Sequence, residues 1–123
     1  MKPRRILLVS SDLMASSRLA GVARGFGDVL DVRAAVPTGD HDAAPYDVVL
    51  LDIQSCPDPA AAIAGVRGRA GQGGVVIAFG PHVWKERLDA AVAAGADAAA
   101  TRGEVMEGLA ALLDRACPRR PGE

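Results

Sequence analysis

The sequence predicts one α/β domain in which a parallel sheet of five strands lies between two layers of helices, a doubly wound, three-layer architecture. Short β-rich segments alternate with segments of helical periodicity along almost the whole chain, and this alternation is typical of right-handed β-α-β crossovers. The run 47–51 is almost entirely apolar, as expected of a central strand that helices cover on both faces. Because 123 residues suit a single core, we expect one domain over residues 1–117 and a disordered tail over residues 118–123.

The first strand is expected at residues 5–9, directly before the first helix. The turn 10–12 contains hydroxyl and carboxylate side chains, which cap helix N-termini. Apolar residues recur at helical spacing over residues 13–26, and Gly27 is suited to end this helix. Its expected apolar face consists of Ala15, Leu19, Val22 and Phe26. A second strand is expected at residues 29–35.

The middle of the chain predicts an abbreviated second helix, because residues 36–46 are rich in proline and glycine and leave room for about one turn. After the strand 47–51, a further helix is expected to begin at Pro59, since Asp58 can cap it and proline suits the first helical position. The glycine-rich run 71–74 is expected to end it. Its expected apolar face consists of Ile63, Val66 and Ala70.

The C-terminal third predicts two more strands and two more helices. The strands are expected at residues 75–79 and 98–101, with a turn at residues 80–82. The helix between them has Leu88, Ala91, Val92 and Gly95 at helical spacing. The last helix has Val105, Leu109, Leu112 and Ala116 at the same spacing. Pro118 cannot continue it.

Charge and hydropathy argue against several classes of partner. The net charge is −1 and no long block of Lys and Arg is present, so we expect no nucleic-acid binding. Apolar runs are much shorter than the roughly 20 residues that span a bilayer, so we expect a cytoplasmic protein without membrane contact. Cys56 and Cys117 lack the spacing of zinc or thiol-redox motifs, and we interpret them as reduced thiols.

Polar residues follow the predicted strands at the carboxyl edge of the sheet, where sites collect in open α/β folds. Asp52 directly follows the run 47–51 and is the candidate working acid, although neighbouring hydroxyls could also hold it in a purely structural role. Asp12 either caps the first helix or turns inward to join Asp52 as a metal ligand. The other residues expected at this crevice are Ser10, Ser11, Gly80, His82 and Arg102.

With these residues in place, the chain resembles the receiver domain of response regulators over nearly its whole length. The resemblance rests on Ile6-Leu7-Leu8-Val9, on Asp47-Val48-Val49-Leu50-Leu51-Asp52 followed by Pro57, and on Ala93-Ala94-Gly95-Ala96-Asp97 leading to Thr101-Arg102. It implies a flavodoxin-like fold in which Asp52 is the phosphoacceptor.

The chain departs from the pattern of that family at four functional positions. Ser10 and Ser11 replace the acidic pair that helps to bind magnesium, and Gly80 replaces the hydroxyl residue after the fourth strand. Arg102 replaces the lysine and Ala99 the aromatic residue of the fifth strand. Mg²⁺ prefers carboxylate oxygens, so we expect Asp12 and Asp52 to bind it weakly, and we expect no other cofactor. The resemblance is therefore to a degenerate, pseudo-receiver type of domain.

In receivers, the helix after the fourth strand, the fifth strand and the last helix form the usual surface for dimers or partner proteins. Trp84, Arg87, Ala99 and Met106 fall on this surface in the present chain. The resemblance implies a protein partner, such as a sensor kinase or a regulatory protein, or a homodimer.

We therefore favour a stand-alone signalling domain, not an enzyme, that acts by protein–protein interaction without magnesium-dependent phosphorylation. One alternative is a working phosphorelay receiver that is phosphorylated on Asp52, with Asp12 and the hydroxyls of Ser10 and Ser11 holding the metal. Another is a sensor of a small ligand or anion, bound in the crevice by Ser10, Ser11, Asp52, His82 and Arg102.

Overall fold

The computed structural model describes residues 2–36 and 45–119. Its strands are β1 (Arg5–Val9), β2 (Val29–Arg33), β3 (Tyr46–Asp52), β4 (Ala70–Gly80) and β5 (Ala98–Thr101). Its helices are α1 (Leu13–Gly25), α2 (Pro59–Arg67), α3 (Lys85–Ala93) and α4 (Arg102–Ala116), with 3₁₀ turns η1 (Ile53–Ser55) and η2 (His82–Trp84). All strand pairs are parallel, in the order β2-β1-β3-β4-β5. This flavodoxin-like order confirms the predicted fold class.

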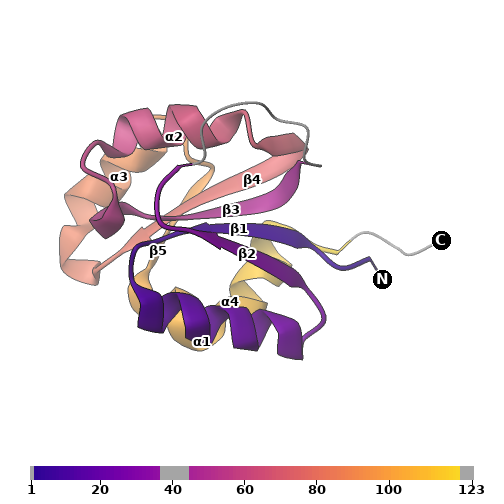
Figure 1. Ribbon diagram of the computed structural model, residues 1–123. Helices are drawn as coiled ribbons and strands as arrows, with labels where there is room; N and C mark the ends of the chain where they lie inside the picture. The colour runs from indigo at the N-terminus through magenta and orange to yellow at the C-terminus, as the bar shows by residue number, and fades with distance from the viewer. Residues whose placement is uncertain (1, 37–44, 120–123) are drawn as a thin grey trace.

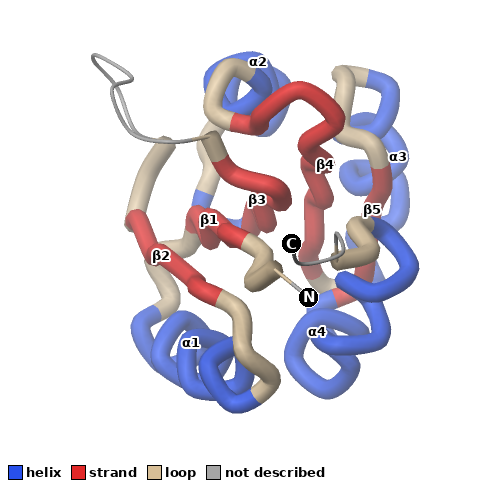
Figure 2. Tube along the Cα trace, turned by 90° about the vertical axis from the view of Figure 1, so that its right-hand side faces the viewer, coloured by secondary structure: helices blue, strands red, loops and turns tan. Residues whose placement is uncertain are grey.

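Helices cover both faces of the sheet. Figure 1 shows α2 and α3 on one side and α1 and α4 on the other, and Figure 2 shows the three layers along the strands. Successive side chains of a strand point to opposite faces, so Ile6 and Leu8 face α1 and α4, whereas Leu7 and Val9 face α2 and α3. All four are completely buried. Double coverage explains why the central strands read as continuous apolar runs.

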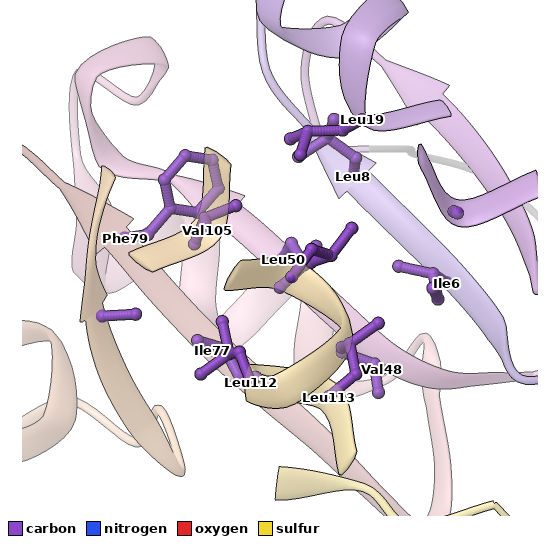
Figure 3. Packing of buried hydrophobic residues seen from close by; sticks show 13 residues of the cluster. Ile6, Leu8, Leu19, Val48, Leu50, Ile77, Phe79, Val105, Leu112 and Leu113 are labelled. Atoms are coloured by element: carbon purple, nitrogen blue, oxygen red, sulfur yellow. The ribbon is translucent and has the colours of Figure 1, made fainter. Parts of the chain in front are cut away.

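The layer between the sheet and α1 and α4 is built mainly from branched aliphatic side chains, with the ring of Phe79 buried among them. Figure 3 shows Leu50 of β3 and Ile77 of β4 at its centre. Val105, Leu109 and Leu112 are buried on α4 as predicted. Close packing of this kind fixes the ends of the strands relative to the helices that follow them.

The buried side of α1 differs from the predicted one. Ala15 and Leu19 are buried as expected, but Val22 is 39% exposed, and Ser16 and Ala23 are buried instead. Small side chains at these two positions let α1 lie close to the sheet, so its buried face is rotated away from Val22. Regular apolar spacing alone does not fix this rotation.

The predicted role of the glycine-rich run 71–74 was wrong. Helix α2 ends earlier, at Arg67 with Gly68 as its C-cap, and β4 already begins at Ala70. Tyr46 of β3 pairs with Ala70 whereas Val48 pairs with Val75, so β4 contains extra residues in an irregularity. Glycine suits such a segment, and Gly73 has a positive φ of 81°.

The expected short helix over residues 36–46 falls mostly outside the described residues. Val36 is described, and it packs against α2 at Gly65, where an added Cβ would lie 3.0 Å from Val36 Cγ1. The start of this connection therefore runs on the side of the sheet that α2 covers.

The turn before β5 explains one of the sequence stretches noted above. Gly95 has a φ of 122°, which favours glycine. Asp97 N–H donates to Val76 O at 2.8 Å, and Val76 N–H donates to Asp97 Oδ2 at 2.7 Å. Arg67 Nη2 lies 2.7 Å from the same carboxylate oxygen. Asp97 thus fastens β5 to β4, and Arg102 directly follows β5.

A second charged cluster closes the amino edge of the sheet. Arg4 is 3% exposed, and its Nε lies 2.6 Å from Asp28 Oδ2, while Arg119 Nε lies 3.2 Å from Asp28 Oδ1. Arg4 Nη1 also lies 3.0 Å from Asp114 Oδ1 on α4. Arg119, in the predicted tail, is therefore held against the domain, whereas residues 120–123 lie outside the described part of the chain.

Among the described residues, no helix is both long enough and apolar enough to cross a bilayer.

Candidate functional site

Asp52 is a buried carboxylate at the carboxyl edge of the central strand. It is the last residue of β3 and only 1% exposed. Ser10 Oγ, which directly follows β1, donates to Asp52 Oδ2 at 2.8 Å. Strands β1 and β3 are neighbours in register, with Val9 beside Leu51, so this contact follows from the topology.

The residues just after Asp52 hold its carboxylate from the other side. Asp52 caps η1, because Gln54 N–H donates to Asp52 Oδ1 at 3.1 Å. Ser55 Oγ donates to Asp52 Oδ2 at 3.2 Å and accepts from Ser11 N–H at 2.9 Å. A ring of hydroxyl and amide donors thus satisfies the buried carboxylate.

Arg102 lies between the two acids of the crevice. It is the first residue of α4, directly after the N-cap Thr101, which forms a reciprocal capping box with Glu104. Arg102 Nη1 lies 3.6 Å from Asp52 Oδ2 and donates to Gln54 Oε1 at 3.3 Å. Arg102 Nη2 forms a close hydrogen-bonded ion pair with Asp12 Oδ2. One guanidinium therefore bridges the two carboxylates.

Asp12 caps the first helix, as one of the two alternatives predicted, and its inward-facing oxygen pairs with Arg102. Its Oδ1 accepts from Ala15 N–H at 3.0 Å and so caps α1, while its other oxygen turns inward to Arg102. The pKa of Asp12 lies below its ordinary value, chiefly because of the Ala15 N–H, with burial acting in the opposite direction and the Arg102 charge adding to the lowering. Asp12 is therefore ionised at neutral pH and remains a counter-ion of Arg102.

The space beside Gly80 is filled by an apolar side chain. A Cβ added at Gly80 would lie 2.9 Å from Ile53 Cγ1 and 3.2 Å from Ile53 Cδ1. Ile53 is the first residue after Asp52 and is 2% exposed. No hydroxyl-bearing side chain fits at position 80 unless Ile53 moves.

The structure brings together most, but not all, of the predicted crevice residues. Ser10, Asp12, Asp52 and Arg102 form one connected network, and Ser11 joins it through Ser55. His82 is exposed in η2 and takes no part in these contacts. Gly80 adds no polar side chain to the network, and Ile53 fills the space beside it.

Sequence reasoning missed Ser55 and Gln54. A signal for them exists: both follow Asp52 within three positions, where a strand-end aspartate commonly caps a short turn. That turn places the Gln54 amide and the Ser55 hydroxyl on the same carboxylate.

The residues of the predicted interaction surface lie on η2, α3, β5 and α4. Arg87 of α3 stacks on Trp84 of η2, with Cζ 4.4 Å from the ring centroid, and both line a cavity against the segment that leads into α2. Ala99 is exposed on β5, and Met106 is partly buried against the core. Strand β5 lies at the edge of the sheet, so α3, β5 and α4 form one continuous side of the domain (Figure 2).

The charges of the crevice form one shared ion-pair network. Two carboxylates face one guanidinium, which is charged at every physiological pH. The remaining polar groups at Asp52 are neutral hydroxyls and an amide. Within residues 2–36 and 45–119, no group of three or more His, Cys, Asp or Glu side chains is arranged to hold a metal ion.

Several solved structures with the same fold are response regulators or receiver domains. A two-component response regulator from Clostridium difficile has a TM-score of 0.76 at 18% identity, over 91% of this chain and 93% of that chain. A response regulator receiver protein from Burkholderia phymatum has a TM-score of 0.66 at 24% identity, over 96% and 100%. The receiver domain of a sensor histidine kinase from Pseudomonas aeruginosa, with magnesium in its active-site cleft, has a TM-score of 0.72 at 18% identity, over 93% and 97%.

No protein-family model matches the sequence, and no curated protein matches it. The likeness therefore shows the fold: this chain has the flavodoxin-like fold of response-regulator receiver domains.

Proposed function

We propose that this protein is a receiver-like signalling domain that acts through protein–protein contacts and does not use magnesium-dependent phosphorylation of Asp52. The observation that carries the proposal is the position of Arg102, whose guanidinium bridges Asp12 and Asp52. The receiver fold supports a role in signalling, and the geometry at Asp52 supports a mode that does not depend on phosphate.

The residues at Asp52 do not fit a magnesium ion. Mg²⁺ needs several hard oxygen ligands in a near-octahedral arrangement, and carboxylates are its preferred protein ligands. Here both available carboxylates are engaged by Arg102. Placing a divalent cation near the Arg102 guanidinium would cost several kcal/mol of gross repulsion at about 4 Å and an effective dielectric near 20. Arg102 thus supplies the positive charge that a metal would otherwise bring.

The elements that would report a phosphoryl group are also altered. Phosphoryl transfer and phosphate sensing depend on positioned donors and cations around the equatorial oxygens. Gly80 has no hydroxyl, and Ile53 fills the space in which one would lie. Ala99 is a single exposed methyl group and cannot alternate between a buried and an exposed ring. The chain therefore lacks both the hydroxyl that would contact a phosphoryl group and the ring that would change position in response.

We place the partner-binding surface on α3, β5 and α4. Ala99 exposes only a methyl group on this surface, so a partner can approach the edge strand β5 closely. The stacked Trp84 and Arg87 lie against the segment that leads into α2 and are not part of the proposed docking contact. A regulatory protein, a sensor kinase or a second copy of the chain would dock here, and Ala99→Arg should weaken that association. Sedimentation analysis of the unmodified chain and of this variant tests the second-copy case.

The decisive experiment is incubation with a small phosphodonor and excess Mg²⁺, followed by intact mass measurement. We expect no phosphoryl adduct, while a phosphorylatable receiver treated in parallel gains one. The Asp52→Asn variant is the matched control for background labelling. A stoichiometric adduct that disappears in Asp52→Asn would refute the proposal and establish the phosphorelay alternative.

Metal binding gives a second, independent readout. Paramagnetic Mn²⁺ broadens amide signals near its site, so a titration followed by NMR maps the ion directly. We expect no saturable broadening around residues 10–12 and 52–55 at millimolar Mn²⁺ in the unmodified chain. We expect it to appear in Arg102→Ala, in which Asp12 and Asp52 lose their shared cation. Saturation in the unmodified chain would contradict the argument from Arg102.

A further inference from the structure

A cavity of about 390 Å³ lies outside the Asp52 network, between the start of α2 and α3. Its base includes Ile53 and Ala91, which are each 2% exposed. One side is formed by the segment 56–60, and the other by Trp84, Arg87 and Ala90. Its volume lies in the range of small-molecule sites, and most of its lining is apolar, as is usual for them.

Two charged side chains line this cavity, Arg87 and Asp58, and they differ in the partners that they already have. Arg87 stacks on the Trp84 ring, and within the described residues it forms no ion pair. Asp58 uses its Oδ1 to accept from Ala61 N–H at 3.2 Å, so it caps α2 and lies at the positive end of that helix. Arg87 is therefore the charge that remains available to a ligand.

The thiol that lines the cavity is neutral. Burial and the nearby charge of Asp52 raise the pKa of Cys56 above its ordinary value. Its Sγ also contacts Asp52 O at 3.4 Å. Cys56 thus contributes a polarizable, uncharged surface and no second charge.

We propose that this cavity binds a small aromatic carboxylate. The ring would lie on the apolar base between the proline-containing segment 56–60 and Trp84, and the carboxylate would pair with the guanidinium of Arg87. A planar guanidinium matches a carboxylate through two parallel N–H donors, and its stacking on Trp84 orders it in advance. None of the residues that would hold the ligand belongs to the ion-pair network of Asp12, Asp52 and Arg102.

Ile53 connects the cavity to the Asp52 site. It lines the cavity, directly follows Asp52, and fills the space beside Gly80. A ligand that shifts Ile53 would therefore also shift the strand ends at Asp52 and Gly80. Binding at this cavity would give the domain an input that requires no phosphoryl group.

The test uses 2-naphthoate as the probe. Trp84 is the single tryptophan of the chain and lines the cavity, so the NMR signal of its indole N–H reports binding there. We expect saturable shifts of this signal with a Kd of about 0.1–1 mM, the range for a ligand of this size. Amide NMR shifts should centre on Ile53, Ala91 and Trp84, with smaller shifts at Gly80. Absence of saturable binding up to about 10 mM overturns the proposal.

Matched variants test the cavity itself. Ala90 is exposed at the cavity, so Ala90→Phe fills it without entering the core. Ala93→Phe places the same ring on an exposed position of α3 that does not line the cavity. Both should keep the thermal midpoint of the unmodified chain, and only Ala90→Phe should lose the probe. Equal binding by the two variants overturns the assignment.

The role of Arg87 is tested by removing the charge either from the protein or from the probe. Arg87→Gln should weaken 2-naphthoate at least about tenfold, as expected for a lost charge-assisted pair. The neutral analogue 2-naphthamide should bind the unmodified chain with a similar loss and should be insensitive to Arg87→Gln. If 2-naphthoate binds Arg87→Gln as well as it binds the unmodified chain, the carboxylate assignment is overturned.

Discussion

The two edges of the sheet each hold a buried aspartate, but they are neutralised in different ways. At the amino edge, the carboxylate of Asp28 is completely buried and contacts Arg4, itself 3% exposed, at 2.6 Å. At the carboxyl edge, Asp52 is held mainly by hydroxyl and amide donors, and Arg102 lies 3.6 Å away with 29% of its side chain exposed. The first arrangement is closed, and the second remains accessible to solvent.

This difference in solvent access distinguishes the structural ion pair of Arg4 and Asp28 from the candidate site at Asp52. Arg4 and Asp28 are both taken out of water, so removing Asp28 would leave the buried Arg4 with only the exposed Asp114 as an acidic partner. Arg102 keeps contact with solvent, so its pairing can change without unfolding the domain. The amino edge thus anchors the C-terminal residues, and the carboxyl edge can respond.

The largest effect is expected from Asp28→Ala. The change removes the acceptor of Arg4 N–H, Arg4 Nε and Arg119 Nε. We expect a loss of about 3–5 kcal/mol in the free energy of unfolding, measured by urea denaturation with circular dichroism. If this variant does not fold, Asp28→Asn provides a measurable intermediate. A loss below about 1 kcal/mol would mean that the two edges do not differ as argued.

A smaller loss is expected when the missing hydroxyl is restored by Gly80→Thr. The new Cβ would lie 2.9 Å from Ile53 Cγ1, so we expect a loss of about 1–3 kcal/mol from overpacking. In an Ile53→Ala background the same substitution should cost at least about 1 kcal/mol less, as a double-mutant cycle would show. Equal costs in both backgrounds would show that Ile53 does not block position 80.

Asp52→Asn is expected to change stability by less than about 1 kcal/mol. The Asn oxygen can still accept from Gln54 N–H, and the hydroxyls of Ser10 and Ser55 can turn to accept from the new side-chain NH₂ group. Arg102 keeps its pair with Asp12. Comparing its free energy of unfolding with that of Asp28→Asn in the same urea conditions isolates the effect of burying the ion pair. A loss at Asp52 as large as that at Asp28 would remove the distinction between the two edges.

The smallest effect is expected at the surface pair of Asp97 and Arg67. Burial opposes ionisation of Asp97, but the Val76 N–H and the Arg67 guanidinium outweigh it, so the pKa of Asp97 lies below its ordinary value. A lowered folded-state pKa stabilises the fold above the unfolded-state pKa, near 3.9, and this stabilisation is lost as the pH falls through the folded-state value.

The pH dependence is measured as the difference in unfolding free energy between the unmodified chain and Asp97→Asn. The difference should be constant above about pH 5, stay below about 1 kcal/mol, and shrink as the pH falls through 4 and below. A difference that grows toward low pH would contradict the sign. If Asp97→Asn lowers the free energy of unfolding only slightly and the Asp28 variants lower it strongly, burial sets the strength of an ion pair, and its position at the amino edge does not.

The sequence predicted the strands and the candidate acid because both depend on local pattern. The first and fifth strands have the predicted bounds, and Asp52 lies at the tip of the central apolar run. The Asp58 cap and the helical start at Pro59 were also predicted, since capping depends on neighbouring residues. The run 71–74 was misinterpreted because glycine is compatible both with a helix end and with an irregular strand.

The sequence by itself determined that a doubly wound sheet would present Ser10, Asp12, Asp52 and Arg102 at one edge, because the alternation of strands and helices makes the strands parallel and brings their carboxyl ends to the same edge. Only the tertiary structure decided which of these side chains meet. Arg102 is 90 positions from Asp12 in the chain. Its bridge between two acids depends on how α4 packs beside α1, and that angle is set by the buried side chains between them. Likewise, Ile53 blocks Gly80 through a contact between separate elements, which no local pattern encodes.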